Sequence, residues 1–221
     1  MQIFENEEHG GTAMRKIGIL GLVGVLALVL AGCGGGDDRN PVIHSLSDRQ
    51  VDGDIGFTAP STFLISLAAA TGNVQYGFDS GGTEFRAFLD FPLDGFTGGG
   101  VVPLNAVIVS ADIEVFVNNV SFASSVPTFL DLVPFPITGT GLTGADFDSA
   151  PLLTRTQFDI RTLDINHFVR IDVTSLMIAA QNRGDRSLQL RFLPASLASG
   201  LVELDDSSVV GDAPRLTVEF R

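Results

Sequence analysis

The chain has 221 residues, of which 26 are acidic and 13 basic, so its formal net charge is −13. This charge excludes a nucleic-acid partner held by phosphate neutralisation. With 45% hydrophobic and 18% charged residues, the composition supports a sizeable core and excludes disorder throughout. The length suits one domain or at most two.

The chain contains a single cysteine, Cys33, which excludes an intramolecular disulfide and a zinc site made of several thiolates. Three histidines are too few for an ordinary histidine-rich metal site. The sequence therefore predicts no cofactor, and if a structural metal is bound we expect calcium held by oxygen atoms.

The amino-terminal segment is typical of a secretory signal peptide. Arg15 and Lys16 precede an uncharged apolar run, residues 17–30. This run is shorter than the roughly 20 residues that a membrane-spanning helix needs. Acidic residues before Met14 have the wrong charge for a leader, so we expect translation to start at Met14.

The residues Leu30-Ala31-Gly32-Cys33 resemble the lipobox of bacterial lipoproteins. The resemblance implies a signal peptide over 1–32, cleavage before Cys33, and acylation of its thiol with palmitate-type chains. Because two or three acyl chains give a lasting anchor, the lipid bilayer is the expected partner of Cys33. Gly34 in place of Asp after the cysteine implies the outer membrane of the cell envelope.

After the cysteine, residues 34–54 combine a glycine run with five aspartates and show no hydrophobic period. This composition predicts a flexible tether over 33–54, followed by one folded domain over 55–221.

The folded part shows short apolar or alternating runs separated by Gly, Pro, Asp and Ser, which is typical of an all-β sandwich or barrel. Runs that alternate with period two predict strands with one wet face, and therefore an antiparallel sheet, at 84–91, 110–117, 168–173 and 215–220. Further strands are expected near 62–68, 74–78, 128–133, 187–193 and 201–204.

One helix is predicted over 174–183. Thr174 can cap its first amides, an apolar stripe runs along one face, and Gly184 can supply the left-handed end. The sequence therefore predicts an antiparallel β-sandwich that contains one short helix.

Four segments in order resemble the DNRLRE domain family: FRAFLDFPL (85–93), NAVIVSADIEVFV (105–117), FVRIDVTSLMIAAQNRGDRSLQLRF (168–192) and APRLTVEF (213–220). The resemblance covers roughly residues 60–221 and implies a jelly-roll β-sandwich on a secreted protein. Some members of that family are carbohydrate-binding modules for acidic polysaccharides such as alginate. The resemblance also implies that residues 172–176 form a structural entry to the helix.

Arginine carries all the positive charge after the leader, and its planar fork suits carboxylate recognition. Three arginines are expected at outward strand positions, where they could bind uronate carboxylates while phenylalanines contact sugar rings. The alternative is that cross-strand pairs with Asp90, Asp112, Asp172 or Glu219 neutralise them. The candidate ligand-binding residues are Arg86, Arg170, Arg191, Phe88, Phe116 and Phe168.

Two acidic clusters have spacings that can place oxygens around calcium, Asp146 with Asp148 and Asp205 with Asp206. The alternative is that both are solvated acidic turns.

Residues 139–144 match G-x-G-x-x-G, but the prolines before them and the aspartates after them exclude a phosphate-binding helix start, so a long loop is expected. The chain has no G-x-S-x-G or H-E-x-x-H motif, and we expect no enzyme activity. Two functions remain open: a lipid-anchored module that binds anionic polysaccharide, or a structural lipoprotein of the envelope that contacts other proteins through an exposed apolar patch.

Overall fold

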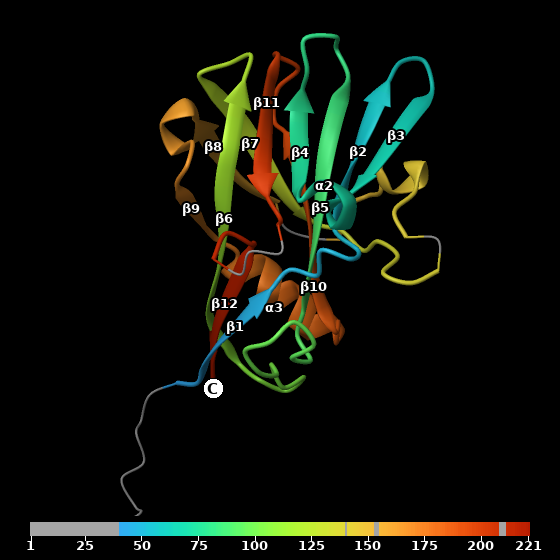
Figure 1. Ribbon diagram of the computed structural model, residues 1–221. Helices are drawn as coiled ribbons and strands as arrows, with labels where there is room; N and C mark the ends of the chain where they lie inside the picture. Colours follow the sequence, from blue (N-terminus) through green and yellow to red (C-terminus); the bar gives the residue numbers. More distant parts are fainter. Residues whose placement is uncertain (1–39, 140, 153–154, 208–210) are drawn as a thin grey trace, which may run out of the picture. The chain divides into compact units, whose positions relative to one another are not determined.

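The computed structural model describes residues 40–139, 141–152, 155–207 and 211–221 (Figure 1). The predicted signal peptide, its start at Met14 and the acylated Cys33 lie outside these residues. The strands are β1 Val42–Leu46, β2 Gly53–Thr58, β3 Thr62–Leu67, β4 Asn73–Phe78, β5 Glu84–Pro92, β6 Ile108–Ser121, β7 Ser125–Leu132, β8 Arg155–Arg161, β9 Phe168–Asp172, β10 Ser187–Pro194, β11 Gly200–Asp205 and β12 Arg215–Phe220.

The described helices are α2, a single turn at Ala68–Thr71, and α3, Thr174–Arg183, with 3₁₀ turns at Gly144–Asp146 and Thr162–Asp164. The prediction of an all-β, antiparallel sandwich with one short helix is confirmed. In the described part of the chain, no helix is long and apolar enough to cross a membrane.

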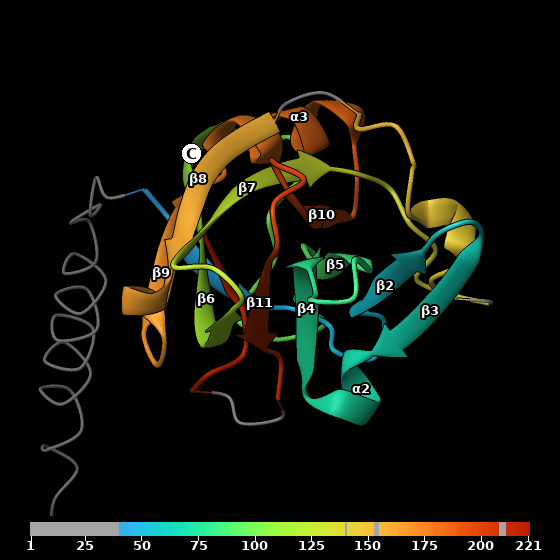
Figure 2. The same ribbon diagram turned by 90° about the horizontal axis from the view of Figure 1, so that it is seen from above.

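The strands form one continuous antiparallel sheet that curls around the core. Its order is β1-β12-β6-β11-β4-β5-β10-β7-β8, with β9 on β6 and the β2–β3 hairpin on β5. Figure 2 shows β6, β11, β4, β5, β10 and β7 arranged in a curve. Strand β6 joins the parts of the sheet, because its first half pairs with β12 and its second half with β11.

The main core lies inside this curve and is sealed by α3. Alternate residues of β6, including Ile113, Val115 and Val117, are fully buried, as their period predicts. In α3, Leu176 and Met177 are buried, while Gly184 adopts the left-handed conformation at φ 75° that ends the helix.

The predicted cap of α3 is wrong in its detail. Val173 occupies the capping position, and the side chain of Thr174 bonds the backbone of Ala111 on β6 instead, accepting its N–H at 3.0 Å. The Asp172 carboxylate accepts the Thr174 N–H at 2.8 Å, and hydrogen bonds from the side chain and the backbone of Thr174 lower the pKa of Asp172. The helix start is thus tied to the central strand.

The flexible tether predicted over 33–54 is wrong from Val42 onward. Residues Val42–Leu46 form β1, which pairs antiparallel with the last strand, β12. Asp52 and Asp54 are buried at the start of β2. These contacts join parts of the chain that are far apart in sequence. The local sequence shows no hydrophobic period that would have predicted these strands.

The wet face predicted for β5 is also wrong. Both faces of the strand are buried from Ala87 onward, and Phe88 is fully buried. The loop 133–152 covers the second face and forms a small separate apolar cluster there, made of Ile55, Phe88, Phe135, Leu142 and Phe147. Period-two alternation within a strand cannot predict that a distant loop will bury the strand's second face.

Candidate functional site

The structure divides the six predicted ligand-binding residues between two places. Arg86, Phe88 and Arg191 lie on β5 and β10 beneath the loop 133–152, which excludes them from an open sugar-binding face. Phe116, Phe168 and Arg170 lie on the outer face of β6 and β9, which we call the β6/β9 face.

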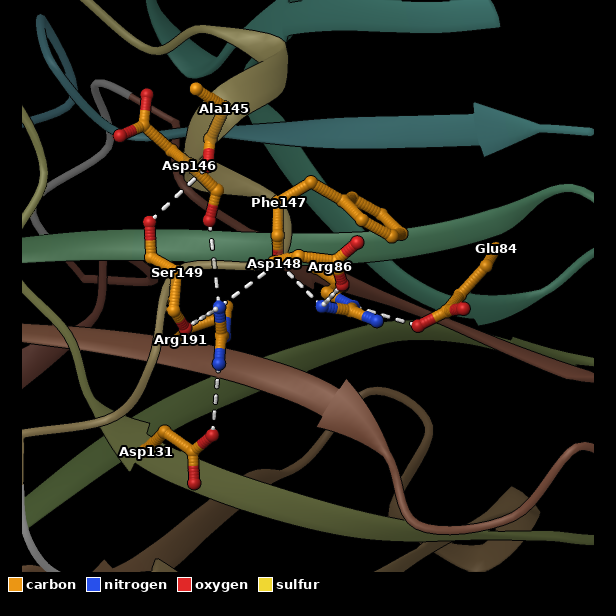
Figure 3. A network of polar contacts seen from close by, with 9 residues as sticks. All are labelled: Glu84, Arg86, Asp131, Ala145, Asp146, Phe147, Asp148, Ser149 and Arg191. Atoms are coloured by element: carbon orange, nitrogen blue, oxygen red, sulfur yellow. Dashed lines mark hydrogen bonds and ion pairs between the residues drawn. The ribbon is translucent and has the colours of Figure 1, made fainter. Parts of the chain in front are cut away.

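Arg191 is buried, so its predicted outward position is wrong. Its Nη2 donates to Asp131 Oδ2 at 3.1 Å, and its Nη1 donates to the carbonyls of Phe147 and Ser149, each at 2.9 Å (Figure 3). Burial lowers the pKa of Arg191, and the hydrogen bond to Asp131 opposes that effect. The guanidinium therefore fastens the loop to the sheet.

Arg86 fastens the same loop from β5. Its Nε donates to Glu84 at 2.7 Å, while its Nη1 donates to the Phe147 carbonyl and to Asp148 Oδ1 (Figure 3). The guanidinium carbon also lies 3.8 Å from the centre of the Phe147 ring, a cation–π contact. Both arginines have structural partners, although neither partner set matches the cross-strand pairs that the sequence suggested.

The β6/β9 face carries an aromatic pair. Phe116 and Phe168 lie directly opposite each other on neighbouring strands, with ring centres 5.1 Å apart in an edge arrangement. Phe168 is 47% exposed. These rings form an apolar platform on an otherwise polar face.

Two ion pairs lie beside this platform, both on the side toward Asp112. Arg170 Nη2 donates to Asp112 Oδ2 at 2.5 Å, and this hydrogen bond raises the pKa of Arg170. Arg215 on β12 donates to Glu114 on β6. The cross-strand pair suggested between Arg170 and Asp112 is therefore present, and both Asp112 and Glu114 next to the aromatic rings have an arginine partner.

The first predicted calcium pair does not converge on one point. Asp146 Oδ2 accepts hydrogen bonds from the backbone and hydroxyl of Thr143 at 2.7 and 2.8 Å, which forms a capping box. Asp148 instead pairs with Arg86. Since Asp146 is buried, it is not a solvated turn residue either.

In the second predicted calcium pair, Asp205 accepts from Asn118 Nδ2 at 3.1 Å and from the Ser207 N–H at 2.9 Å. Asp206 is buried and faces Asp52. Among the described residues, no group of three or more His, Cys, Asp or Glu side chains could hold a metal ion.

The carboxyl pair Asp52–Asp206 is a feature that sequence reasoning missed. Asp52 Oδ1 accepts the Asp90 N–H at 2.6 Å, and Ser47 Oγ donates to Asp206 Oδ1 at 3.2 Å. Burial, followed by the charge of Asp206, raises the pKa of Asp52 well above its usual value, and burial raises that of Asp206 to about 6. One shared proton would satisfy the two facing carboxyl groups.

Among the described residues, pockets lie around α3 and the turn that follows it. One of about 200 Å³ is lined by Phe135, Leu152 and Arg186 among others, and a second of similar volume shares Arg186. Arg186 is exposed and makes no ion pair with the described residues. The position of Arg186 beside two pockets could not be predicted from the sequence.

No protein-family model and no curated protein matches this chain. The fold and the site define the protein only as an all-β, antiparallel domain with an aromatic platform on one open sheet face. The resemblance to the DNRLRE family stays a prediction.

Proposed function

We propose that the protein is a lipid-anchored, non-catalytic module of the cell envelope that binds polysaccharide on the β6/β9 face. The observation that carries the proposal is the Phe116–Phe168 platform beside Arg170, in which Phe116 is partly buried and Phe168 is exposed. The lipobox-like sequence ending at Cys33 supports the anchor, and Gly34 supports the outer membrane as its location.

The chemistry of the platform suits a sugar ring. Aromatic side chains offer apolar surface to the C–H faces of sugars, and neighbouring polar groups fix the orientation. Arg170 could exchange part of its contact with Asp112 for a uronate carboxylate, since both are bidentate partners for a guanidinium. The ion pairs of Asp112 and Glu114 offset part of the repulsion that a polyanion meets on an acidic domain.

Binding is tested by titrating the full chain with alginate, pectin and a neutral glucan in a calorimeter. We expect alginate or pectin to bind, and Phe168→Ala to weaken binding by about three- to tenfold, the amount expected for losing an aromatic contact. Phe96→Ala is the matched control, because Phe96 is 75% exposed and lies outside the β6/β9 face.

Equal affinities for Phe168→Ala and Phe96→Ala, or no heat with any glycan, would remove the glycan proposal. The anchor is tested separately in cells that express the full chain: labelled palmitate should enter the parent chain and be absent from Cys33→Ser.

The second candidate function is protein contact within the envelope. A specific observation favours it, because β3 exposes a run of apolar side chains, including Phe63 at 41% and Leu64 at 57%. Such patches are typical of interaction sites.

A further inference from the structure

Strand β3 is an apolar edge strand. In the described part of the chain it pairs only with β2, so its other edge offers backbone groups to a further strand. Phe63, Leu64, Ile65 and Leu67 are 41%, 57%, 47% and 39% exposed. Phe63, Ile65 and Leu67 share one face of the strand, and Leu64 lies between Thr62 and Ser66 on the other, so the edge carries one apolar face.

This edge is already held in an extended shape. Phe57 on β2 contacts Phe63 with ring centres 5.1 Å apart, and Phe147 contacts Phe63 at 5.8 Å. The ring of Phe63 also packs closely over Gly144, leaving no room there for a Cβ. A partner strand would thus meet a preformed template and would lose little conformational freedom on binding.

Charge indicates the kind of occupant. No residue between Asp54 and Asp79 is charged, although the whole chain carries −13. The edge lacks the lysines that commonly protect sheet edges. A second copy of this chain is equally acidic, so two copies meet least repulsion where this uncharged stretch faces itself.

The sequence of β3 is self-complementary in one antiparallel register. With a two-fold axis at Ile65, Ile65 lies opposite its own copy and Phe63 lies opposite Leu67. Each of these pairs lies on the face that β3 shares with Ile55 and Phe57 of β2. The register places apolar residues opposite apolar residues along that whole face.

We propose that two copies of the protein associate through antiparallel pairing of their β3 strands, which joins the two sheets across a two-fold axis at Ile65. This inference goes beyond glycan binding and uses a different edge of the sheet. It gives the second candidate function a definite partner, a second copy of the chain.

The register is tested by disulfide trapping of the full chain in membranes. Ile65→Cys should form a disulfide-linked dimer on mild oxidation, because residues directly opposite in an antiparallel pair have the spacing that a disulfide needs. Phe63→Cys alone should not, whereas a mixture of Phe63→Cys and Leu67→Cys should. The parent chain, which has Cys33 only, sets the background.

Association is measured independently by sedimentation of the purified full chain in detergent. Ile65→Lys should raise the dissociation constant of the dimer by about tenfold or more, since it places two like charges opposite each other. Leu197→Lys is the matched control, because Leu197 is 89% exposed and lies outside β3. Circular dichroism of each variant should show the parent's strand signal.

A parent chain that stays monomeric at micromolar concentration would overturn the proposal, as would an Ile65→Lys variant that still dimerises. Trapping of Phe63→Cys as efficient as that of Ile65→Cys would overturn the register. Loss of dimerisation with glycan affinity unchanged separates this inference from the glycan proposal, because Phe168 and Ile65 lie on different strands.

Discussion

At the scale of single residues, Arg191 is the cation that holds the loop 133–152 against the sheet. It is 2% exposed and pairs with Asp131, which has no exposed surface. Three backbone carbonyls of the loop 133–152 accept from its Nη1. A buried ion pair is weak evidence for stability, but removing one partner leaves an uncompensated charge.

Arg191→Met should therefore lower the free energy of unfolding by about 3–5 kcal/mol, because the buried Asp131 loses this ion-pair partner and the loop carbonyls lose a donor. Urea denaturation measures the change. Arg186→Met is the control and should change the value by less than about 0.5 kcal/mol, since Arg186 is exposed. Similar losses in both variants would show that Arg191 does not hold the loop.

At the scale of elements, the short strand β1 is held in place by the loop between β5 and β6, residues 93–107. Ser45 Oγ donates to the Pro92 carbonyl at 2.8 Å, and Thr97 Oγ1 donates to the Leu46 carbonyl at 2.6 Å. The loop crosses β1 so closely that a Cβ on Gly99 would lie 1.4 Å from the His44 carbonyl oxygen. Gly99 also has φ 79°, which favours glycine.

Gly99→Ala should destabilise the domain by about 1–3 kcal/mol more than Gly98→Ala does. Gly98 has φ 108° but open space around its Cβ position, so its substitution adds only the backbone cost. Hydrogen exchange should report faster opening of the β1 amides in Gly99→Ala. Equal stability of the two variants would contradict the close crossing.

The elements also show which parts of the fold a sequence can predict. Strands with one buried face, such as β6 and β12, and the helix ending at Gly184 were predictable because their signals are local. Strand β1 was not, since it exists through pairing with β12 at the other end of the chain.

The candidate site divides in the same way. Arg170 pairs across strands with Asp112, as one reading of the sequence suggested, because both lie on regular strands with one open face. The burial of Arg191 and Phe88 could not be predicted, because the loop 133–152 covers them and loops carry no period that would reveal where they pack. The exposed apolar edge of β3 was visible only once its pairing partner was known.

At the scale of the whole molecule, buried carboxyl groups make the domain sensitive to pH. Burial raises the pKa of Asp54 to about 7 and those of Asp90 and Asp206 to about 6, and it raises that of Asp52 well above its usual value. The groups facing the Asp52–Asp206 pair include Asp205 and the cation Arg49, which lowers the pKa of Asp206.

Because these pKa values are higher in the folded than in the unfolded chain, the folded state binds more protons between about pH 4 and pH 7. The free energy of unfolding should therefore fall as pH rises through this range. Asp52→Asn should raise it at pH 8 by an amount on the order of 2 kcal/mol and flatten the profile, since its amide can accept from the Asp90 N–H and donate to Asp206.

Urea denaturation from pH 4 to pH 8 provides the measurement. Asp212→Asn is the control, because this carboxyl group is partly exposed on the turn before β12 and should leave the profile unchanged. A profile of Asp52→Asn that matches the parent's would contradict proton sharing in the pair.

The position of β1 sets how far the domain can reach. The first strand begins at Val42, and if the acyl chains are on Cys33 as proposed, eight residues, 34–41, separate the lipidated residue from the strand. Even fully extended, such a leash spans only about 30 Å. The domain would then stay within a thin layer next to the bilayer. Confinement to this layer raises the local concentration of neighbouring copies, and it restricts the sugars that the domain can reach to those close to the membrane.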